Sequence, residues 1–216
     1  MNPKKPKNTM NNALIHENLR KRNVDEDDDD FSQEISIRAI GDHVWFYSPI
    51  NPASAVRLNA VLQDLSMKLA PTAFSSMHEV STPSPIWLHV NSYGGEVFSS
   101  FAMADTIERI SQIVPVVTIV EGCAASGATF MSTAGARRLM RKNAFMLIHE
   151  LSGGGWGKFS DLKDNMKSNT TIMAAIKNWY EEKSKLPKKE LDVILSRDIW
   201  WNAKTCLKYG LVDQII

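Results

Sequence analysis

The stretch PVVTIVEGCAASGATFMSTAGARRLMRKNAFMLIHE, residues 115–150, decides the fold of this chain. It opens with five apolar or β-branched residues, 116–120, a pattern typical of a strand buried on both faces. A second apolar run, 145–148, ends at His149, and Ser126 lies between the two runs among residues too small to cover its hydroxyl. We therefore expect Ser126 and His149 each to follow a buried strand, where α/β folds place reactive side chains.

Strand-like and helix-like patterns alternate along the rest of the chain. The predicted elements are helices over 52–69, 98–110 and 160–185 and strands over 35–40, 44–47 and 86–90. Such alternation is typical of an α/β fold with parallel strands joined by crossovers. Arg137 and Arg138 are interpreted as a basic turn before the strand that carries His149. Residues 71–85, with three prolines and several serines, predict a loop.

The composition allows one sizeable core. Of the 216 residues, 44% are hydrophobic, and we expect a single folded domain over 35–216. The formal net charge of +1 gives no electrostatic argument for nucleic acid or a membrane surface as a partner. Residues 1–34 carry basic side chains followed by the acidic run 25–30, with few apolar residues, and predict a disordered or processed N-terminal tail.

Cysteine content and hydropathy together indicate a cytoplasmic protein. Cys123 and Cys206 are too few for a disulfide framework, so we expect both thiols to be reduced. No run reaches the roughly 18 apolar residues of a membrane span, and the apolar run 13–15 is too short for a signal peptide. We predict no metal site and no other cofactor, because four of the histidines lack metal-ligand spacing: His16, His43, His78 and His89.

Ser126, His149 and Asp198 are the candidate catalytic residues. A serine hydroxyl becomes a nucleophile when a base within hydrogen-bond reach takes its proton, and a third group must orient that base. Asp198, which precedes two tryptophans, is the candidate for the third role. The chain order serine, histidine, aspartate excludes the α/β-hydrolase arrangement, in which the acid precedes the histidine. The residues alone leave open that Ser126 is a tight-packing position and that His149 is satisfied by a backbone carbonyl.

Four short blocks carry a resemblance to a known family. Residues 91–95 (NSYGG), 122–127 (GCAASG), 146–149 (MLIH) and 209–213 (YGLVD) resemble, in order and spacing, the signature blocks of the proteolytic subunits of Clp protease, the ClpP family. The resemblance covers about residues 35–216. It implies a ClpP/crotonase-like α/β fold of repeated β-β-α units, from which a handle helix, here about 152–186, protrudes.

The resemblance also assigns roles to individual residues. It implies that Ser126 is the nucleophile, that His149 is the general base and then acid, and that Asp198 orients the imidazole. The backbone N–H groups of Gly95 and Gly127 would form the oxyanion hole. Adjacent glycines at a strand end support that pair independently, because no side chain obstructs a close approach to the backbone. The implied reaction is hydrolysis of peptide bonds through an acyl-enzyme, without a cofactor.

The family further implies an assembly. Its members form seven-membered rings that stack in pairs as a tetradecamer, and an AAA+ unfoldase feeds unfolded polypeptide into the enclosed chamber. Residues 1–34 do not match the family's docking region, so a partner unfoldase is an open expectation. An apolar stripe on the predicted handle helix fits either contact with another subunit or packing on its own: Ile172, Met173, Ile176, Trp179 and Tyr180.

Two departures from the family pattern adjoin the expected site. Tyr93 occupies the place of a proline, and Glu150 and Leu151 replace the glutamine and proline that follow the histidine. They bear on substrate preference and remove no catalytic atom. Two other functions remain as alternatives: a non-catalytic structural subunit of such a ring, and a crotonase-like acyl-CoA enzyme.

Overall fold

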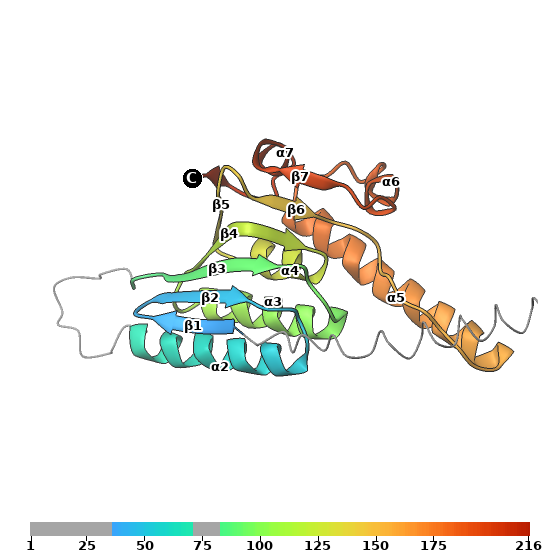
Figure 1. Ribbon diagram of the computed structural model, residues 1–216, viewed down its shortest axis with the longest axis horizontal. Coiled ribbons are helices and arrows are strands. Elements are labelled where there is room, and N and C mark those ends of the chain that lie inside the picture. The colour runs from blue at the N-terminus through green and yellow to red at the C-terminus, as the bar shows by residue number, and fades with distance from the viewer. Residues whose placement is uncertain (1–35, 71–82) are drawn as a thin grey trace, which may run out of the picture. The chain divides into compact units, whose positions relative to one another are not determined.

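The computed structural model describes residues 36–70 and 83–216 (Figure 1). Eight strands form one sheet: β1 (Ser36–Ile40), β2 (His43–Tyr47), β3 (Ile86–Ser92), β4 (Val116–Ala125), β5 (Arg137–Met140), β6 (Phe145–Leu147), β7 (Trp200–Asn202) and β8 (Gln214–Ile215). The described helices are α2 (Pro52–Leu69), α3 (Val97–Ser111), α4 (Gly127–Thr133), α5 (Phe159–Lys183), α6 (Leu191–Leu195) and α7 (Ala203–Lys208). The predicted α/β class is confirmed.

Strand β4 is the centre of the sheet. Its first five residues are buried, as expected from their apolar, β-branched character. It pairs in parallel with β3 on one side, whereas on the other side residues 117–120 pair with β5 and residues 123–125 pair with β6. One long strand therefore has two successive neighbours on the same side. This arrangement brings the end of β6, and with it His149, beside the end of β4.

Strands β2, β3, β4 and β5 run parallel to one another in the middle of the sheet. Strand β1 pairs antiparallel with β2 through a tight turn at Gly41, where φ is +60°. Because the carboxyl ends of parallel strands meet at one edge, the residues that follow β3, β4 and β6 lie together. The predicted placement of Ser126 and His149 after strands is confirmed.

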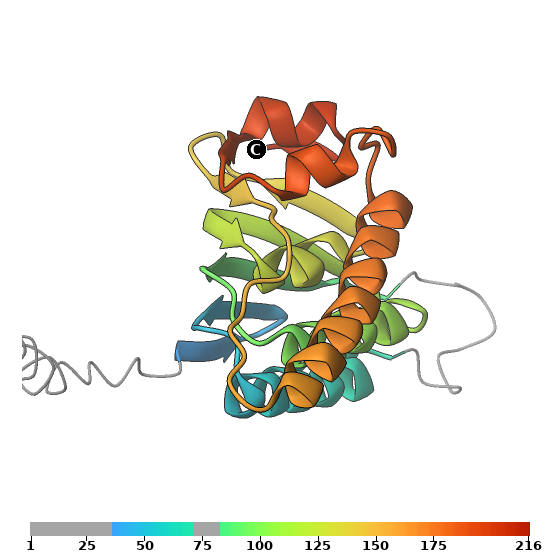
Figure 2. The same ribbon diagram turned by 90° about the vertical axis from the view of Figure 1, so that its right-hand side faces the viewer.

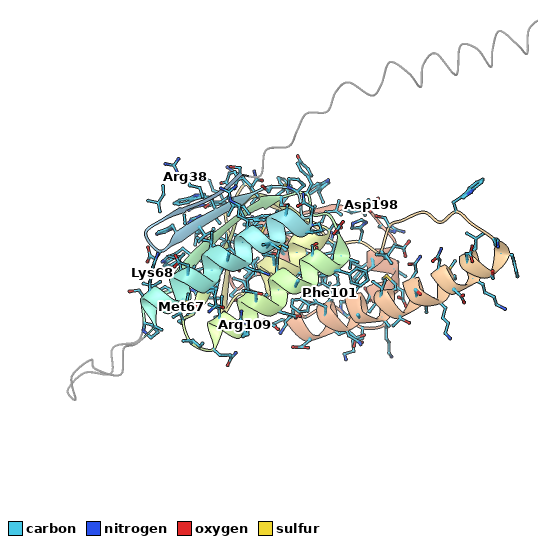
Figure 3. The ribbon with its side chains drawn as sticks, turned by 90° about the horizontal axis from the view of Figure 1, so that it is seen from below. Arg38, Met67, Lys68, Phe101, Arg109 and Asp198 are labelled. Atoms are coloured by element: carbon cyan, nitrogen blue, oxygen red, sulfur yellow. The ribbon has the colours of Figure 1, made fainter. Side chains whose placement is uncertain are left out.

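Helix α2 begins where the sequence predicts. Asn51 caps it, since its Oδ1 accepts a hydrogen bond from the Ser54 N–H at 2.9 Å, and the Ser54 hydroxyl in turn accepts from the Asn51 N–H. Pro52 occupies the first helical position, which needs no donor. Figure 3 shows α2 and α3 side by side, and Arg109 of α3 donates a hydrogen bond to Gln63 of α2 at 3.0 Å.

The long helix α5 confirms the prediction of a helix over 160–185. It projects beyond the sheet at its N-terminal end, and its last turns return to the core (Figures 1 and 2). The apolar stripe proves to pack on its own chain there, because Ile176, Trp179 and Tyr180 are buried in the main core. Towards the other end, Phe159 and Met166 are exposed.

The predicted turn at Arg137 and Arg138 is wrong, because both residues belong to β5. Their backbone pairs with β4, opposite Val117 and Thr118. Such a short strand has no recognisable periodicity, and its side chains are satisfied by partners far away in the sequence. Arg138 donates from its backbone and side chain to the Asp213 carboxylate and from its guanidinium to the carbonyls of Lys183 and Gly210.

Some expectations fall outside the described residues. The predicted N-terminal tail, 1–34, and residues 71–82 of the predicted loop belong to this group. Within the described ranges, no helix combines the length and the hydropathy required to cross a bilayer.

We predict that Asp213→Asn destabilises the fold by about 1 kcal/mol at pH 7, because it removes the charge that Arg138 neutralises. Burial opposes ionisation of Asp213, but the hydrogen bonds from Arg138 outweigh it and lower the pKa of this carboxyl below its usual 3.8. Its contribution is therefore present above about pH 4 and lost as the pH falls through the lowered pKa. Urea unfolding at pH 7 and at about pH 3 measures both effects.

Asp64→Asn is the matched control, because Asp64 and Lys68 form an exposed pair four residues apart on α2. We expect a change within about 0.5 kcal/mol and little dependence on pH. Equal effects of the two substitutions would contradict a stabilising role of Asp213.

Candidate active site

Ser126 lies at an abrupt turn between β4 and α4. Its φ is +53° and its ψ is −127°, and among the described residues no other non-glycine has a positive φ. Its N–H donates to the carbonyl of Leu147 at 2.8 Å, which ties the turn to the end of β6. Strained strand-to-helix turns of this kind present a side chain at the end of a sheet. The turn therefore leaves the Ser126 side chain half-buried at the sheet edge.

His149 and Asp198 face each other two residues beyond β6 and two residues before β7. The His149 Nδ1 atom is 3.3 Å from the Asp198 Oδ1 atom. The histidine side chain is 18% exposed and the aspartate side chain is 79% exposed, so Asp198 stands at the surface (Figure 3). The Glu150 N–H donates to the carbonyl of Leu195 at 2.8 Å, and this bond holds the segment after His149 on α6, close to Asp198.

Ser126 and His149 line one cavity of about 160 Å³. Its base is apolar, because three of the lining residues belong to the main core: Phe130 of α4 and Ile176 and Tyr180 of α5. Its rim contains the peptide at Gly95, the exposed Glu96 and the exposed Glu150. The cavity therefore offers an apolar recess beside a hydroxyl and an imidazole.

The Ser126 hydroxyl makes no hydrogen bond to His149 or to any other described residue in this arrangement. The structure thus brings Ser126 and His149 to the same cavity and joins His149 to Asp198. The hydrogen bond between Ser126 and His149, which a catalytic triad requires, is not formed. Catalytic hydrogen bonds are often long in the absence of a substrate and tighten when it binds.

The glycines of the predicted oxyanion hole are required by close packing. A Cβ at Gly95, whose φ is +150°, would lie 2.0 Å from the carbonyl oxygen of Ile50, and one at Gly127 would lie 2.1 Å from the Ser100 hydroxyl. The Gly95 N–H has no acceptor among residues 36–70 and 83–216. Gly127 is the first residue of α4, so its N–H has no intrahelical acceptor either. Two residues that line one cavity therefore each carry a backbone N–H without a backbone acceptor.

Two of the departures from the family pattern, Glu150 and Leu151, line the cavity, and the third, Tyr93, lines a separate hollow. Tyr93 is 78% exposed and meets Trp200 edge-on, with ring centroids 6.2 Å apart. These two residues, together with Cys123 and Phe145, line a second, open hollow of about 340 Å³. Leu151 is fixed by a hydrogen bond from its N–H to the Met173 sulfur at 3.4 Å.

Both cysteines are free thiols. Burial raises the pKa of Cys123, and burial raises the pKa of Cys206 to about 12. Both groups are therefore protonated at neutral pH and are poor nucleophiles. This result agrees with the interpretation of Ser126 as the reactive group.

A polar cluster that the sequence did not reveal lies on β2, β3 and β4, away from the cavity. His89 is buried and hydrogen-bonds Glu121 at 2.6 Å and His43 at 2.9 Å. Burial opposes ionisation of Glu121, but the hydrogen bonds from Arg141 and His89 outweigh it and lower the pKa of the carboxyl. Across the described part of the chain, no three His, Cys, Asp or Glu side chains are grouped so that they could hold a metal ion.

Sequence reasoning missed a contact beside the cavity, between Thr129 of α4 and Tyr180 of α5. Their hydroxyl oxygens lie 2.6 Å apart beneath Ser126. The sequence gives one indication of this contact. Tyr180 belongs to the apolar stripe of a helix, and a buried phenol requires a hydrogen-bond partner. The sequence could not identify that partner, which belongs to another helix.

Comparison with known protein families gives a match that covers most of the chain. Residues 47–216 match the family model described as Clp protease. The matched range contains β3, β4, β6 and the segments that line the cavity. It agrees with the resemblance and the fold that the four sequence blocks indicate.

We predict that Ser126→Gly has a higher free energy of unfolding than Ser126→Ala, by about 1 kcal/mol. Alanine retains the Cβ that strains the positive φ, whereas glycine adopts this conformation freely. Urea unfolding of the two variants measures the difference.

Ser132, inside α4, supplies the matched pair. There Ser132→Gly should be less stable than Ser132→Ala by about 0.5–1 kcal/mol, because glycine is unfavourable within a helix. The same order of stability at both positions would refute a strained turn at Ser126.

Proposed function

The chain belongs to the Clp protease family, and from this membership we propose that it is a serine endopeptidase that hydrolyses peptide bonds of unfolded polypeptides. We assign this activity to residues 35–216, with residues 152–186 as a handle and residues 1–34 as a tail outside the catalytic domain. Ser126, His149 and Asp198 are the catalytic residues in this proposal.

Each residue has a defined chemical role in this reaction. Ser126 attacks the scissile carbonyl carbon while the His149 Nε2 atom accepts the hydroxyl proton, and the C–N bond then breaks as His149 returns that proton to the leaving amine. Asp198 orients the imidazole through Nδ1. Water, activated in the same way, hydrolyses the resulting acyl-enzyme. The N–H groups of Gly95 and Gly127 stabilise the negative charge on the former carbonyl oxygen.

One observation carries the proposal. Ser126 in its strained turn and His149 line the same cavity, and His149 presents Nδ1 to Asp198, which leaves Nε2 for the serine. The apolar base formed by Phe130, Ile176 and Tyr180 suits an apolar side chain in the residue whose carbonyl is attacked.

The assembly that we propose is a pair of stacked seven-membered rings that enclose the active sites. The exposed half of α5 supports this part of the proposal. Phe159, the first residue of α5, is 83% exposed, the exposed Met166 lies two turns further along the helix, and Trp156, three residues before the helix, is 98% exposed. Large apolar side chains at such positions are typical of surfaces that another subunit covers. An AAA+ unfoldase would deliver the polypeptide.

A non-catalytic structural subunit is the second candidate function. It is favoured by the missing hydrogen bond between Ser126 and His149 and by the exposure of Asp198. The crotonase-like acyl-CoA enzyme has no specific observation in its favour.

We expect a fluorophosphonate probe to label Ser126 in the purified protein. Labelling requires an activated serine, so it should fall strongly in His149→Ala and Asp198→Ala, and mass spectrometry of the adduct identifies the residue. Ser126→Ala should lower kcat/KM for a peptide substrate on the order of 10⁶-fold, about 8 kcal/mol of barrier.

The control for this experiment is Ser152→Ala, because Ser152 lines the same cavity without a proposed role. It should leave labelling unchanged. An assembled ring in which no serine is labelled would favour the structural subunit instead.

We expect the double substitution Phe159→Asp and Met166→Asp to separate stacked rings, because it places charges on the exposed apolar face of α5. Native mass spectrometry would then report single rings in place of paired ones. The pair Ser160→Asp and Ser168→Asp adds the same charge to exposed polar positions of α5 and should leave the assembly intact. If paired rings persist in the Phe159→Asp and Met166→Asp variant, α5 does not form the interface between the rings.

A further inference from the structure

Two hydrogen bonds from Thr129 hold the carbonyl of Ser126. The Thr129 hydroxyl donates to this oxygen at 2.6 Å, and the Thr129 N–H donates to it at 2.9 Å. Thr129 belongs to α4, three residues after the serine, and it is fully buried. The Ser126 carbonyl is therefore fixed in direction by two donors of one residue.

A third residue fixes the threonine. The Tyr180 hydroxyl lies 2.6 Å from the Thr129 Oγ1 atom. Since the Thr129 proton is directed at the Ser126 carbonyl, the Thr129 oxygen acts as the acceptor and Tyr180 acts as the donor. Tyr180 is 1% exposed, and burial raises the pKa of its phenol, so it retains the proton that it donates. A chain of hydrogen bonds thus runs from α5 through α4 to Ser126.

The geometry of the peptide bond connects this chain to the proposed chemistry. The carbonyl of Ser126 and the N–H of Gly127 belong to one planar peptide unit and point in opposite directions when that unit is trans. The structure has no cis peptide bond among its described residues. Whatever fixes the Ser126 carbonyl therefore also fixes the direction of the Gly127 N–H.

We propose that Thr129 and Tyr180 are positioning residues, which hold the Ser126 carbonyl and with it the ψ of Ser126, and so aim the Gly127 N–H at the oxyanion. The proposal rests on the proposed function, because it assigns the oxyanion contact to Gly127. Neither residue touches the reacting atoms through its hydroxyl. Without the Thr129 hydroxyl, only the Thr129 N–H holds this carbonyl, and the peptide between Ser126 and Gly127 rotates more easily.

The experiment compares two isosteric substitutions on α4. Thr129→Val removes the hydroxyl that links Tyr180 to Ser126. Thr133→Val is the matched control, because the Thr133 hydroxyl accepts a comparable buried hydrogen bond from Trp179 of α5, at 2.9 Å, without contacting Ser126. Both variants lose one contact between α4 and α5, so a general loosening of the helices would affect them equally.

We expect Thr129→Val to lower kcat about 10- to 100-fold with KM within about twofold, because a misdirected oxyanion donor weakens binding of the transition state and not of the substrate. Thr129→Ser retains the hydroxyl and should restore most of kcat. Tyr180→Phe should lower kcat about threefold to tenfold, since the threonine keeps its own donors. Thr133→Val should leave kcat unchanged.

Equal values of kcat in Thr129→Val and Thr133→Val would overturn the proposal, as would failure of Thr129→Ser to restore activity. Crystal structures of the same variants give a test that needs no activity. We expect the ψ of Ser126 and the direction of the Gly127 N–H to change in Thr129→Val alone, and unchanged values there would refute the positioning role. The proposed function would be refuted if the wild-type protein neither cleaves peptides nor is labelled at Ser126 by the fluorophosphonate. In that case the crystal structures of the variants would still show whether Thr129 holds the turn.

Discussion

The positive φ of Ser126 is the constraint on which the rest of the site depends. A non-glycine residue in such a conformation costs about 1–3 kcal/mol, and it persists only when its surroundings determine it. Here the N–H is held by Leu147, and the carbonyl is held by Thr129. Gly94 closes the third side, since a Cβ at that position would lie 2.9 Å from the Ser126 Cβ. Strand β6, helix α4 and the end of β3 therefore each contribute one restraint to a single turn.

The register of β4 supplies the remaining geometry. A strand of ordinary length would have one neighbour on each side, but the ten residues of β4 pair first with β5 and then with β6. The end of β6 thereby reaches Ser126, and the polypeptide continues two residues to His149. Strand β7 pairs antiparallel with β6 and carries the segment that contains Asp198 to the same edge. Three residues far apart in the sequence therefore lie at one edge of the sheet because one strand exchanges partners along its length.

The sequence predicts the features that local patterns specify, and it fails where distant partners decide. The strand at 116–120 and the helix at 52–69 follow from apolar periodicity and from a proline at the helix start. The short strand at Arg137 has no such pattern, because its pairing with β4 and its contacts near Asp213 define it. The link between Thr129 and Tyr180 spans 51 residues, and no local rule selects either hydroxyl. The apolar runs predict the places of Ser126 and His149 after strands β4 and β6, whereas the roles of the two residues were expected from the resemblance to the family.

Helix α5 has two halves with different environments, and this difference limits how assembly can affect the site. Its last turns are buried against α4 through Trp179 and Tyr180, whereas Phe159 at its other end is exposed. A subunit that covers the exposed half would have two routes to the cavity, because the exposed Glu150 and Ser152 line it and the last turns of α5 contribute Ile176 and Tyr180 to it. Through α5, it would alter the turn at Ser126 by displacing the last turns of the helix, and only to the extent that it binds one position of the helix more tightly than another. The hydroxyl of Tyr180 is where such a displacement would first reach the residues that hold the serine.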